Sequence, residues 1–317
     1  MIIDVLNCAH FVCERSTHVA IEEEAVPQFA RKLLPMLLPA WDFTHHFYDG
    51  TARTVAYLLL VDALNFCFFP EPRWEVVVDG ERLHGYFALT SVLKQAFERD
   101  DPIDDFSHLA KVEEEEVRDL LHGDVPMGKI PLFEERVQIL REVGERMTSL
   151  YHGDAAKLVR KVNKSAQRLV ELVVESFPSF RDEAYYAGEQ IAFHKRAQIF
   201  AGDLYGSFGS RSFGALHDVA RLTAFADYKL PQILRAEGIL RYCEELAARI
   251  DHRALIEAGS SYEVEIRAAT VLVVDLLRQE LKRQGRNLLA IEIDWLLWHA
   301  AQRCDIPAHH RTLTTFY

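Results

Sequence analysis

The chain has 317 residues, and 49% of them are hydrophobic, which is enough to bury one large core or two smaller ones. Its net charge of −12 excludes the strongly basic surface that binds duplex nucleic acid, although a small anion needs only a few local cations. Five scattered cysteines without a CxxC pair argue against a disulfide framework or a zinc site and favour a reducing, cytoplasmic location.

The N-terminal segments show helical periodicity. Residues 1–16 lack the basic leader of a signal peptide, and no apolar run in the chain is long enough to span a membrane. Residues 22–38 are typical of short helical turns interrupted by prolines. Residues 53–69 predict a strongly apolar helix or extended run that ends at Pro70.

Residues 74–88 give the clearest β signal of the chain. Residues that favour strands flank Asp79-Gly80, a dipeptide that suits the tight turn of a hairpin. Helical periodicity then returns, and the acidic run at 113–116 suits the solvated first turn of a helix that ends at Gly123.

The second half is almost entirely helical in its periodicity. Within residues 190–206, one buried helical stripe is predicted at Phe193, Ala197, Phe200 and Leu204. Residues 206–214, rich in glycine and serine, predict a loop. The segment after this loop predicts an apolar helix that ends near Phe225, followed by a short break and a second helix.

Two long helices complete the chain. Ser260 and Glu263 have the spacing of a capping box, and a basic end precedes Gly285. The last helix, within residues 287–302, is apolar nearly all round, as buried helices are. With no repeat or linker, the sequence predicts one mainly helical domain over residues 1–317 with a small β-hairpin.

One acid lies in that last apolar helix. In helical projection Asp294 falls between Ile291 and Trp298. A buried carboxylate is costly unless it is paired or hydrogen-bonded. Asp294 is therefore either a structural salt-bridge or capping residue, or an acid in an apolar pocket, as acid–base and glycosidic chemistry require.

A second acid, Asp227, occupies the predicted break between two helices. It suits the N-cap of the helix that follows, because aspartate is a favoured capping residue. Acid, phenol and ammonium in consecutive positions, Asp227, Tyr228 and Lys229, also fit a polar site at a helix N-terminus, where anions are favoured. Both interpretations stay open.

Other charged residues give weaker signals. Lys195 and Arg196 precede the predicted buried stripe, so they either extend to the surface or bind a phosphate. Asp203, seven residues after Arg196 on the same helix side, is interpreted as structural.

Common catalytic motifs are absent from the sequence. The histidine doublets at 45–46 and 309–310 lack a metal-binding spacing such as HExxH, so no metal site is expected. No GxSxG elbow, Rossmann fingerprint or P-loop ending occurs. The chemistry available is two carboxylates, a few cations and many aromatic rings, an inventory that suits cleavage of a glycosidic bond next to a planar base.

Seven ordered blocks of the sequence carry a family resemblance. They are DALNFCFF, VESFPSFRD, FHKRAQIFAGDLYG, LTAFADYKLPQILR, GSSYEVEIRAAT, IEIDWLLW and HHRTLTTFY. From about residue 40 to the C-terminus the chain resembles the queuosine salvage proteins. The resemblance implies a helical fold similar to helix-hairpin-helix DNA glycosylases. It also implies hydrolysis of queuosine 5′-monophosphate to release queuine, with no metal or organic cofactor.

The resemblance also implies roles for residues that match the family blocks. Asp294 would be the catalytic carboxylate, and Asp227 a second acid that lines the base pocket. Lys195 would face the phosphate. The implied substrate-binding residues are His45, Lys195, Phe225, Asp227, Tyr228, Lys229, Trp298 and His299. The chain departs from the family at Lys229, where arginine is more frequent, at His299, where an acid is frequent, and in PAHHRT, where the family has PHHRT or PFHRT.

The chemistry of a 7-deazaguanine base agrees with these roles. The base presents adjacent N–H donors on one edge, which the Asp227 carboxylate can accept, while Phe225 stacks on its face. Asp294 would then lie under the ribose and stabilise positive charge at the anomeric carbon, attack it, or activate water. The opposite assignment of the two acids is also open.

Two other functions remain open. A glycosylase for damaged DNA bases is suggested by the fold analogy, but the acidic balance weighs against it. A binding protein for a modified base or nucleotide would have no use for a carboxylate under the sugar. The sequence leaves open the oligomeric state and the preference between nucleotide and nucleoside.

Overall fold

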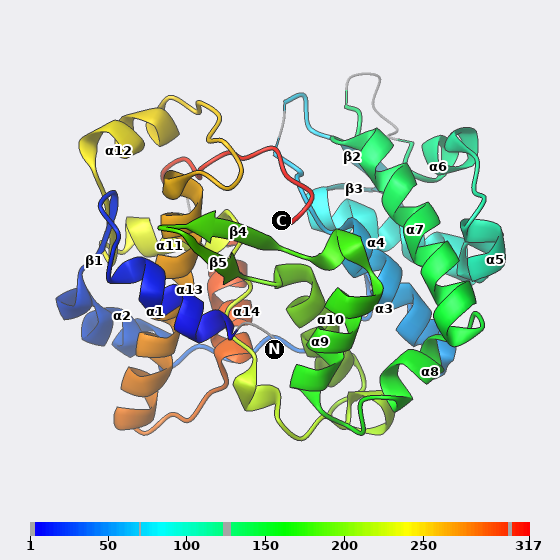
Figure 1. Ribbon diagram of the computed structural model, residues 1–317, viewed down its shortest axis with the longest axis horizontal. Coiled ribbons are helices and arrows are strands. Elements are labelled where there is room, and N and C mark those ends of the chain that lie inside the picture. Colours follow the sequence, from blue (N-terminus) through cyan, green and yellow to red (C-terminus); the bar gives the residue numbers. More distant parts are fainter. Residues whose placement is uncertain (1–3, 70, 123–127, 304–305) are drawn as a thin grey trace.

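The computed structural model describes residues 4–69, 71–122, 128–303 and 306–317, and it is mainly helical, as the sequence predicts (Figure 1). The α-helices are α1 (Val5–Cys13), α2 (Val26–Leu33), α3 (Ala52–Leu64), α4 (Gly85–Glu98), α5 (Phe106–Leu109), α6 (Glu114–Leu120), α7 (Phe133–Tyr151), α8 (Ala155–Arg160), α9 (Ala166–Ser176), α10 (Lys195–Ser207), α11 (Lys229–Ala236), α12 (Glu244–Asp251), α13 (Ser261–Arg283) and α14 (Ala290–Arg303). Short 3₁₀ turns lie at Glu23–Ala25, Pro102–Asp104, Pro178–Phe180, Ser212–Gly214 and Val219–Arg221.

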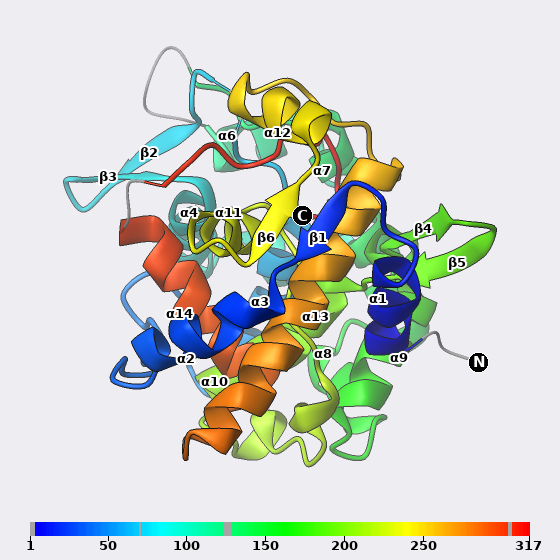
Figure 2. The ribbon, with the colours of Figure 1, turned by 90° about the vertical axis from the view of Figure 1, so that its left-hand side faces the viewer.

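Short antiparallel strand pairs join these helices. The pairs are β1 (Val19–Ile21) with β6 (Leu240–Tyr242), β2 (Glu75–Val78) with β3 (Glu81–His84), and β4 (Glu183–Tyr186) with β5 (Glu189–Ala192). Strands β1 and β6 come from distant parts of the chain and lie across the surface beside α13 (Figure 2).

Two groups of helices face each other across the molecule. Helix α13 packs against α1, α2, α11 and α14 on one side, and α3 packs against α4, α7 and α8 on the other (Figure 1). Helix α10 contacts α3 and α9 and is buried along almost its whole length. In the described ranges, no helix is both long and apolar enough to cross a membrane.

The predicted hairpin is confirmed, but it is shorter than the predicted range of residues 74–88. Its turn is Asp79-Gly80, with both residues at positive φ. The second strand ends at His84, and Gly85, at φ +59°, turns the chain directly into α4. Residues 85–88 therefore belong to a helix, because a glycine accepts the left-handed conformation that the change of direction requires.

The predicted apolar helix that ends near Phe225 is wrong. Only one 3₁₀ turn, Val219–Arg221, precedes a non-helical segment, residues 222–228. Side chains from other helices take its backbone N–H groups: Gln198 accepts from Thr223 at 2.8 Å, and Asp294 accepts from Phe225 at 2.7 Å. The N–H groups of Thr223 and Phe225 are therefore unavailable for helical hydrogen bonds. The apolar side chains of this segment would be buried equally well in a helix or in an extended segment, so their pattern does not distinguish the two.

Helix boundaries also differ in detail around α10. Phe193, predicted to open the buried stripe, precedes the helix, because His194 at φ +49° forms its N-cap. The predicted loop at 206–214 begins later, since α10 continues to Ser207 and Ser212–Gly214 forms a 3₁₀ turn.

Capping predictions are confirmed at two helices. The Ser260 hydroxyl accepts the N–H of Glu263 at the start of α13. Residues 113–116 are exposed at the start of α6, where Glu113 and Glu116 form a capping box. The predicted end of this helix at Gly123 lies outside the described residues.

Candidate active site

A cavity of about 510 Å³ lies where the two groups of helices meet. Its lining comes from the segment before α3, the turn after α3, the start of α4, one face of α10, the segment 225–229, α14 and the C-terminal residues. Because these segments are distant in sequence, the fold itself assembles the cavity.

One face of α10 forms a wall of the cavity. Lys195, Ile199, Asp203 and Gly206 all line it, at spacings of four, four and three residues. This spacing places their side chains on one side of a helix. Gly202, next to Asp203, contacts a ring: a Cβ there would lie 2.9 Å from Cζ of Phe225. Phe225 therefore packs directly on the helix backbone.

Asp227 both caps α11 and faces the cavity. Its Oδ1 accepts the backbone N–H groups of Lys229 at 2.7 Å and Leu230 at 3.0 Å. Its Oδ2 receives no hydrogen bond from the residues that the structure describes, and the side chain lines the cavity. The capping interpretation is therefore confirmed, and one oxygen is left for a ligand.

Asp294, on α14, is a buried acid of the cavity. Its Oδ2 accepts the N–H of Phe225 at 2.7 Å, and its side chain is 4% exposed. Burial raises the pKa of Asp294 well above its ordinary value, and the charges of Asp227 and Asp203 raise it further. Within the described ranges, no cation lies within 4.0 Å of its carboxylate, so the structural salt bridge is not formed.

Lys195 is buried rather than exposed at the surface. It is the first residue of α10, and its Nζ makes one long hydrogen bond, 3.5 Å to the carbonyl of Asn65. Burial lowers its pKa, and Asp227 is the main opposing charge. Arg196 points away from the cavity and donates to the carbonyls of Ala63 and Ser179, so it is structural.

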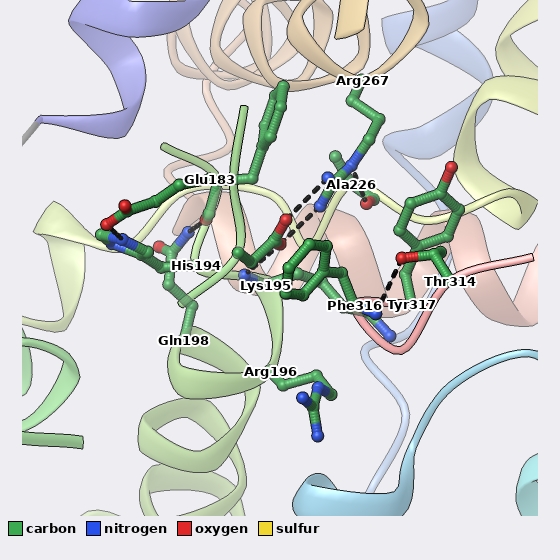
Figure 3. A network of polar contacts seen from close by, with 12 residues as sticks. Glu183, His194, Lys195, Arg196, Gln198, Ala226, Arg267, Thr314, Phe316 and Tyr317 are labelled. Carbon is green, nitrogen blue, oxygen red and sulfur yellow. Dashed lines mark hydrogen bonds and ion pairs between the residues drawn. The ribbon is translucent and has the colours of Figure 1, made fainter. Parts of the chain in front are cut away.

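A buried ionic network fixes the start of α10 (Figure 3). Asp182 accepts the backbone N–H of Lys195 at 3.0 Å and pairs with Arg267 through both oxygens, at 2.8 and 2.6 Å. Arg267 also donates to the carbonyl of Ala226 at 3.2 Å and to Glu263 at 3.3 Å. One network therefore orients the backbone next to both Lys195 and Asp227.

The remaining residues of the predicted substrate-binding set lie mostly on the cavity wall. Phe225, Tyr228, Lys229, Trp298 and His299 all line it. Tyr228 packs on His309, with ring centroids 4.6 Å apart. Trp298 packs on the rings of Tyr86 and Phe87, at 5.8 and 5.6 Å.

His45 is the exception. It is not among the lining residues; its Nδ1 pairs with Asp42 at 2.6 Å, and its ring packs on Phe87. The next residue, His46, lines the cavity instead, and its Nε2 lies 2.9 Å from the hydroxyl of Tyr86. Burial lowers the pKa of His46 to about 4, so its ring is neutral at pH 7.

Positive charge gathers along one part of the lining. Arg73, Lys229, Arg253 and Arg311 line the cavity together with His84 and His309. They lie close enough to affect one another: burial lowers the pKa of His309 to about 4, and Lys229, Arg311 and Arg253 contribute to this. A chain of net charge −12 thus carries a local basic surface suited to a small anion.

Asp203, interpreted as structural from the sequence, is a further cavity acid. Asp203 lines the cavity wall near Asp294. The sequence spacing had suggested a structural role instead, because Asp203 shares a helix side with Arg196. A signal was available in the sequence: Ile199 and Asp203 follow Lys195 by four and eight residues, a spacing that predicts one shared helix face. In the parts of the chain that the structure describes, no three His, Cys, Asp or Glu side chains are arranged to hold a metal ion.

Comparisons with known proteins agree with this geometry. A sequence model of the queuosine salvage protein family matches residues 45–317. The chain is 44% identical to a queuosine 5′-phosphate N-glycosylase/hydrolase of Sphaerobacter thermophilus, covering 99% of this chain and 97% of that protein. It is 36% identical to the protein with the same name in Mus musculus, covering 98% and 97%. A Dictyostelium discoideum protein of that name is 39% identical, covering 84% and 79%. The chain therefore belongs to the queuosine salvage protein family.

Proposed function

We propose that this protein hydrolyses the N-glycosidic bond of queuosine 5′-monophosphate and releases queuine and ribose 5-phosphate for salvage of the base in tRNA modification. One observation carries the proposal: Asp227 and Asp294 line one cavity, and each is held by backbone N–H groups through one oxygen and keeps the other. The curated names of the relatives above support the same reaction.

Asp227 would hold the base. Its Oδ1 already accepts two backbone N–H groups, so Oδ2 is the oxygen that can accept the N–H donors of the 7-deazaguanine edge. The ring of Phe225, pressed against Gly202, would stack on the base face. Asp227 would therefore hold the base through one carboxylate oxygen rather than two, because Oδ1 already accepts backbone N–H groups of α11.

Asp294 would carry the glycosidic chemistry. Departure of the base leaves positive charge on the anomeric carbon, and a carboxylate beneath it stabilises that charge. Because burial makes the ionised Asp294 costly in the free protein, a developing cation next to it gains more than it would in water. The stabilisation is therefore greater for the transition state than for the neutral sugar of the ground state.

Substitutions of Asp227 can separate holding the base from capping the helix. Asn caps helices as well as Asp, so Asp227→Asn should keep the fold and lower kcat/KM by about 100-fold through loss of a charge-assisted contact. Asp227→Ala should show the same loss of activity and also lose about 0.5–2 kcal/mol of stability. Steady-state kinetics and thermal melting measure the two effects. Full activity in Asp227→Asn would show that the base is held elsewhere.

The basic part of the lining would bind the 5′-phosphate. Lys195 remains the proposed phosphate contact from the family resemblance, while Lys229, Arg253 and Arg311 offer a cluster nearer the surface. A phosphate at these cations would explain why a phosphorylated nucleoside is the substrate.

Lys229→Met tests the cluster. Because Lys229 is half-buried, its loss should raise KM for the nucleotide about 10-fold and change KM for the nucleoside queuosine little. Lys157→Met, at an exposed position on α8, is the matched control and should change neither. An equal effect on nucleotide and nucleoside would place the phosphate away from Lys229.

The arrangement of the chain as a single domain, residues 1–317, is part of the proposal, supported by a cavity lined from both groups of helices. The likeness to helix-hairpin-helix DNA glycosylases stays a prediction.

The direct test is incubation of the purified protein with queuosine 5′-monophosphate and detection of free queuine by mass spectrometry. We expect repeated turnover, with ribose 5-phosphate in equal amount. Saturable binding with the nucleotide recovered intact would favour the binding protein instead. A shift of duplex DNA in electrophoresis, without queuine release, would favour the DNA glycosylase.

A further inference from the structure

Two buried carboxyl groups on the packed helices α3 and α10 have no role in the proposal above, and one of them lines the cavity. Asp62, on α3, has no exposed surface, and neither of its oxygens has a hydrogen-bond partner among the described residues. Asp203, on α10, lines the cavity, and its Oδ2 is likewise buried and unpartnered. Helices α3 and α10 pack together. Such groups are costly to bury, so a shared proton or a ligand must satisfy them.

The electrostatics favour protonation of this pair. Burial raises the pKa of Asp62 well above its ordinary value, and the charge of Asp203 raises it further, while Lys195 and Arg196 oppose this. Burial also raises the pKa of Asp203, with Lys195 opposing. Two neighbouring buried carboxyls cannot both ionise, and burial raises the pKa of Asp203 to about 8, so the pair carries at most one negative charge near neutral pH. Asp203 lines the cavity and Asp62 does not, so a cationic ligand that enters the cavity favours the charge on Asp203 and the proton on Asp62.

Aromatic rings enclose this end of the cavity. Gly206, one turn after Asp203, packs against two indoles, because a Cβ there would lie 3.2 Å from Trp41 and 3.4 Å from Trp295. The ring of His46 lies 4.8 Å from that of Trp41. The indole N–H of Trp41 is also buried without a partner in the described part of the chain. A carboxylate in a part of the cavity lined by indole rings favours a cation, through both the charge and the ring faces.

The two parts of the lining therefore differ in charge. The basic cluster of Lys229, Arg253 and Arg311 suits an anion, whereas Asp203 with its indoles suits a cation. Queuosine 5′-monophosphate has the same polarity, with a phosphate on the sugar and a protonated secondary amine on the side chain of the base. Bound with its phosphate at the basic cluster, it would direct the amine toward the other part of the lining.

We propose that Asp203, on the part of the cavity wall that Trp41 and Trp295 also line, recognises an alkylammonium group carried by the base, and that Asp62 keeps its proton so that a single charge develops on the pair. The inference rests on the proposed function and deepens it. It makes Asp203 a residue that determines substrate specificity, because a neutral substituent would give its carboxylate no ammonium group to pair with.

Three nucleotides test the inference. Queuosine 5′-monophosphate and 7-aminomethyl-7-deazaguanosine 5′-monophosphate both carry an ammonium group, and 7-cyano-7-deazaguanosine 5′-monophosphate carries a neutral group of similar size to the aminomethyl. In Asp203→Asn, kcat/KM for the two amines should fall about 10- to 100-fold relative to the cyano compound, as expected for loss of one charge-assisted contact. An equal loss for all three would show a structural role only. A loss confined to queuosine 5′-monophosphate would show recognition of its hydroxyls, and would overturn the inference.

Two further variants keep the test sharp. Asp62→Asn leaves the carboxylate on Asp203 and should keep the preference for amines, whereas loss of that preference would contradict the division between the two acids. Trp41→Leu should also reduce the preference for amines, as Asp203→Asn does. It provides an independent test if Asp203→Asn proves too unstable for kinetic measurements.

Calorimetry separates this inference from the proposed function. If the wild-type protein cleaves none of the nucleotides, the proposed function fails, but the affinities for queuine and 7-cyano-7-deazaguanine still test Asp203. Asp203→Asn should then weaken queuine binding about 10- to 100-fold relative to the cyano base. Equal weakening of both would overturn the inference on its own.

Discussion

Replacing Asp294 by asparagine is expected to lower kcat at least about 100-fold while leaving the fold intact, comparable to removal of one strong electrostatic contact from an active site. The asparagine carbonyl can still accept the N–H of Phe225, so the segment 222–228 keeps its anchor on α14. What is lost is the negative charge beneath the developing cation.

The measurement is kcat for queuosine 5′-monophosphate, with thermal melting as a check on folding. Asp275→Asn is the matched control, because Asp275 lies on α13 and pairs with Arg278 at 2.7 Å, outside the cavity lining. The control should keep normal turnover. Near-normal turnover in Asp294→Asn would show that the catalytic role lies elsewhere, with Asp227 as the first candidate.

The pH profile gives a second view of the same carboxylate. Asp294 acts in its ionised form, and burial raises its pKa, so activity should fall on the acid side at a higher pH than for an exposed aspartate. In a plot of kcat/KM against pH, this limb belongs to the free protein. A phosphate monoester also titrates near pH 6, at about its second pKa, so the nucleoside serves as the control substrate. An acid limb at the ordinary aspartate value would contradict the assignment.

Replacing Arg267 by methionine is expected to cost about 3–5 kcal/mol of unfolding free energy, because it leaves buried carboxylates without their cation. Arg267 and Asp182 are each 2% exposed in their side chains, and Glu263 is 4% exposed. Burial already raises the pKa of Glu263, with Arg267 as the main opposing influence. Asp182 also holds the N–H of Lys195, so the loss extends to the start of α10 (Figure 3).

Urea unfolding measures this cost. Arg278→Met is the control, because Arg278 pairs with Asp275 at the surface of the same helix and its loss should cost less than about 1 kcal/mol. A loss below about 1 kcal/mol in Arg267→Met would show that the network does not hold the two halves of the site together. Arg267→Lys should recover only part of the stability, since lysine cannot form the paired contact with Asp182.

Local signals in the sequence predicted much of the fold. The Asp79-Gly80 turn, the Ser260 cap and the acidic start of α6 depend on neighbouring residues alone, and each is confirmed. The prediction of a helix within residues 222–228 failed because side chains of α10 and α14, distant in sequence, hold the backbone of this segment. Apolar composition indicates that such a segment is buried, but not which donors it must satisfy.

The site was predictable where chemistry and local sequence coincide. Asp294 stands out as an acid in an apolar helix, and Asp227 as an acid at a helix start, and both line the cavity. Asp203 and His46 were missed because their positions depend on how α10 and the segment before α3 pack together. For Lys195 the sequence left open a place at the surface or at a phosphate, and the structure buries it in the cavity wall among residues from other segments.

The division of labour between Asp227 and Asp294 is tested most directly by a crystal structure of the protein with queuine bound. We expect Oδ2 of Asp227 within hydrogen-bond distance of the N–H edge of the base, with Phe225 stacked on its face. The carboxylate of Asp294 should lie beside the glycosidic nitrogen, facing the space of the departed ribose. Queuine bound with Asp294 on its N–H edge and Asp227 facing the ribose space would contradict the assignment and exchange the two roles.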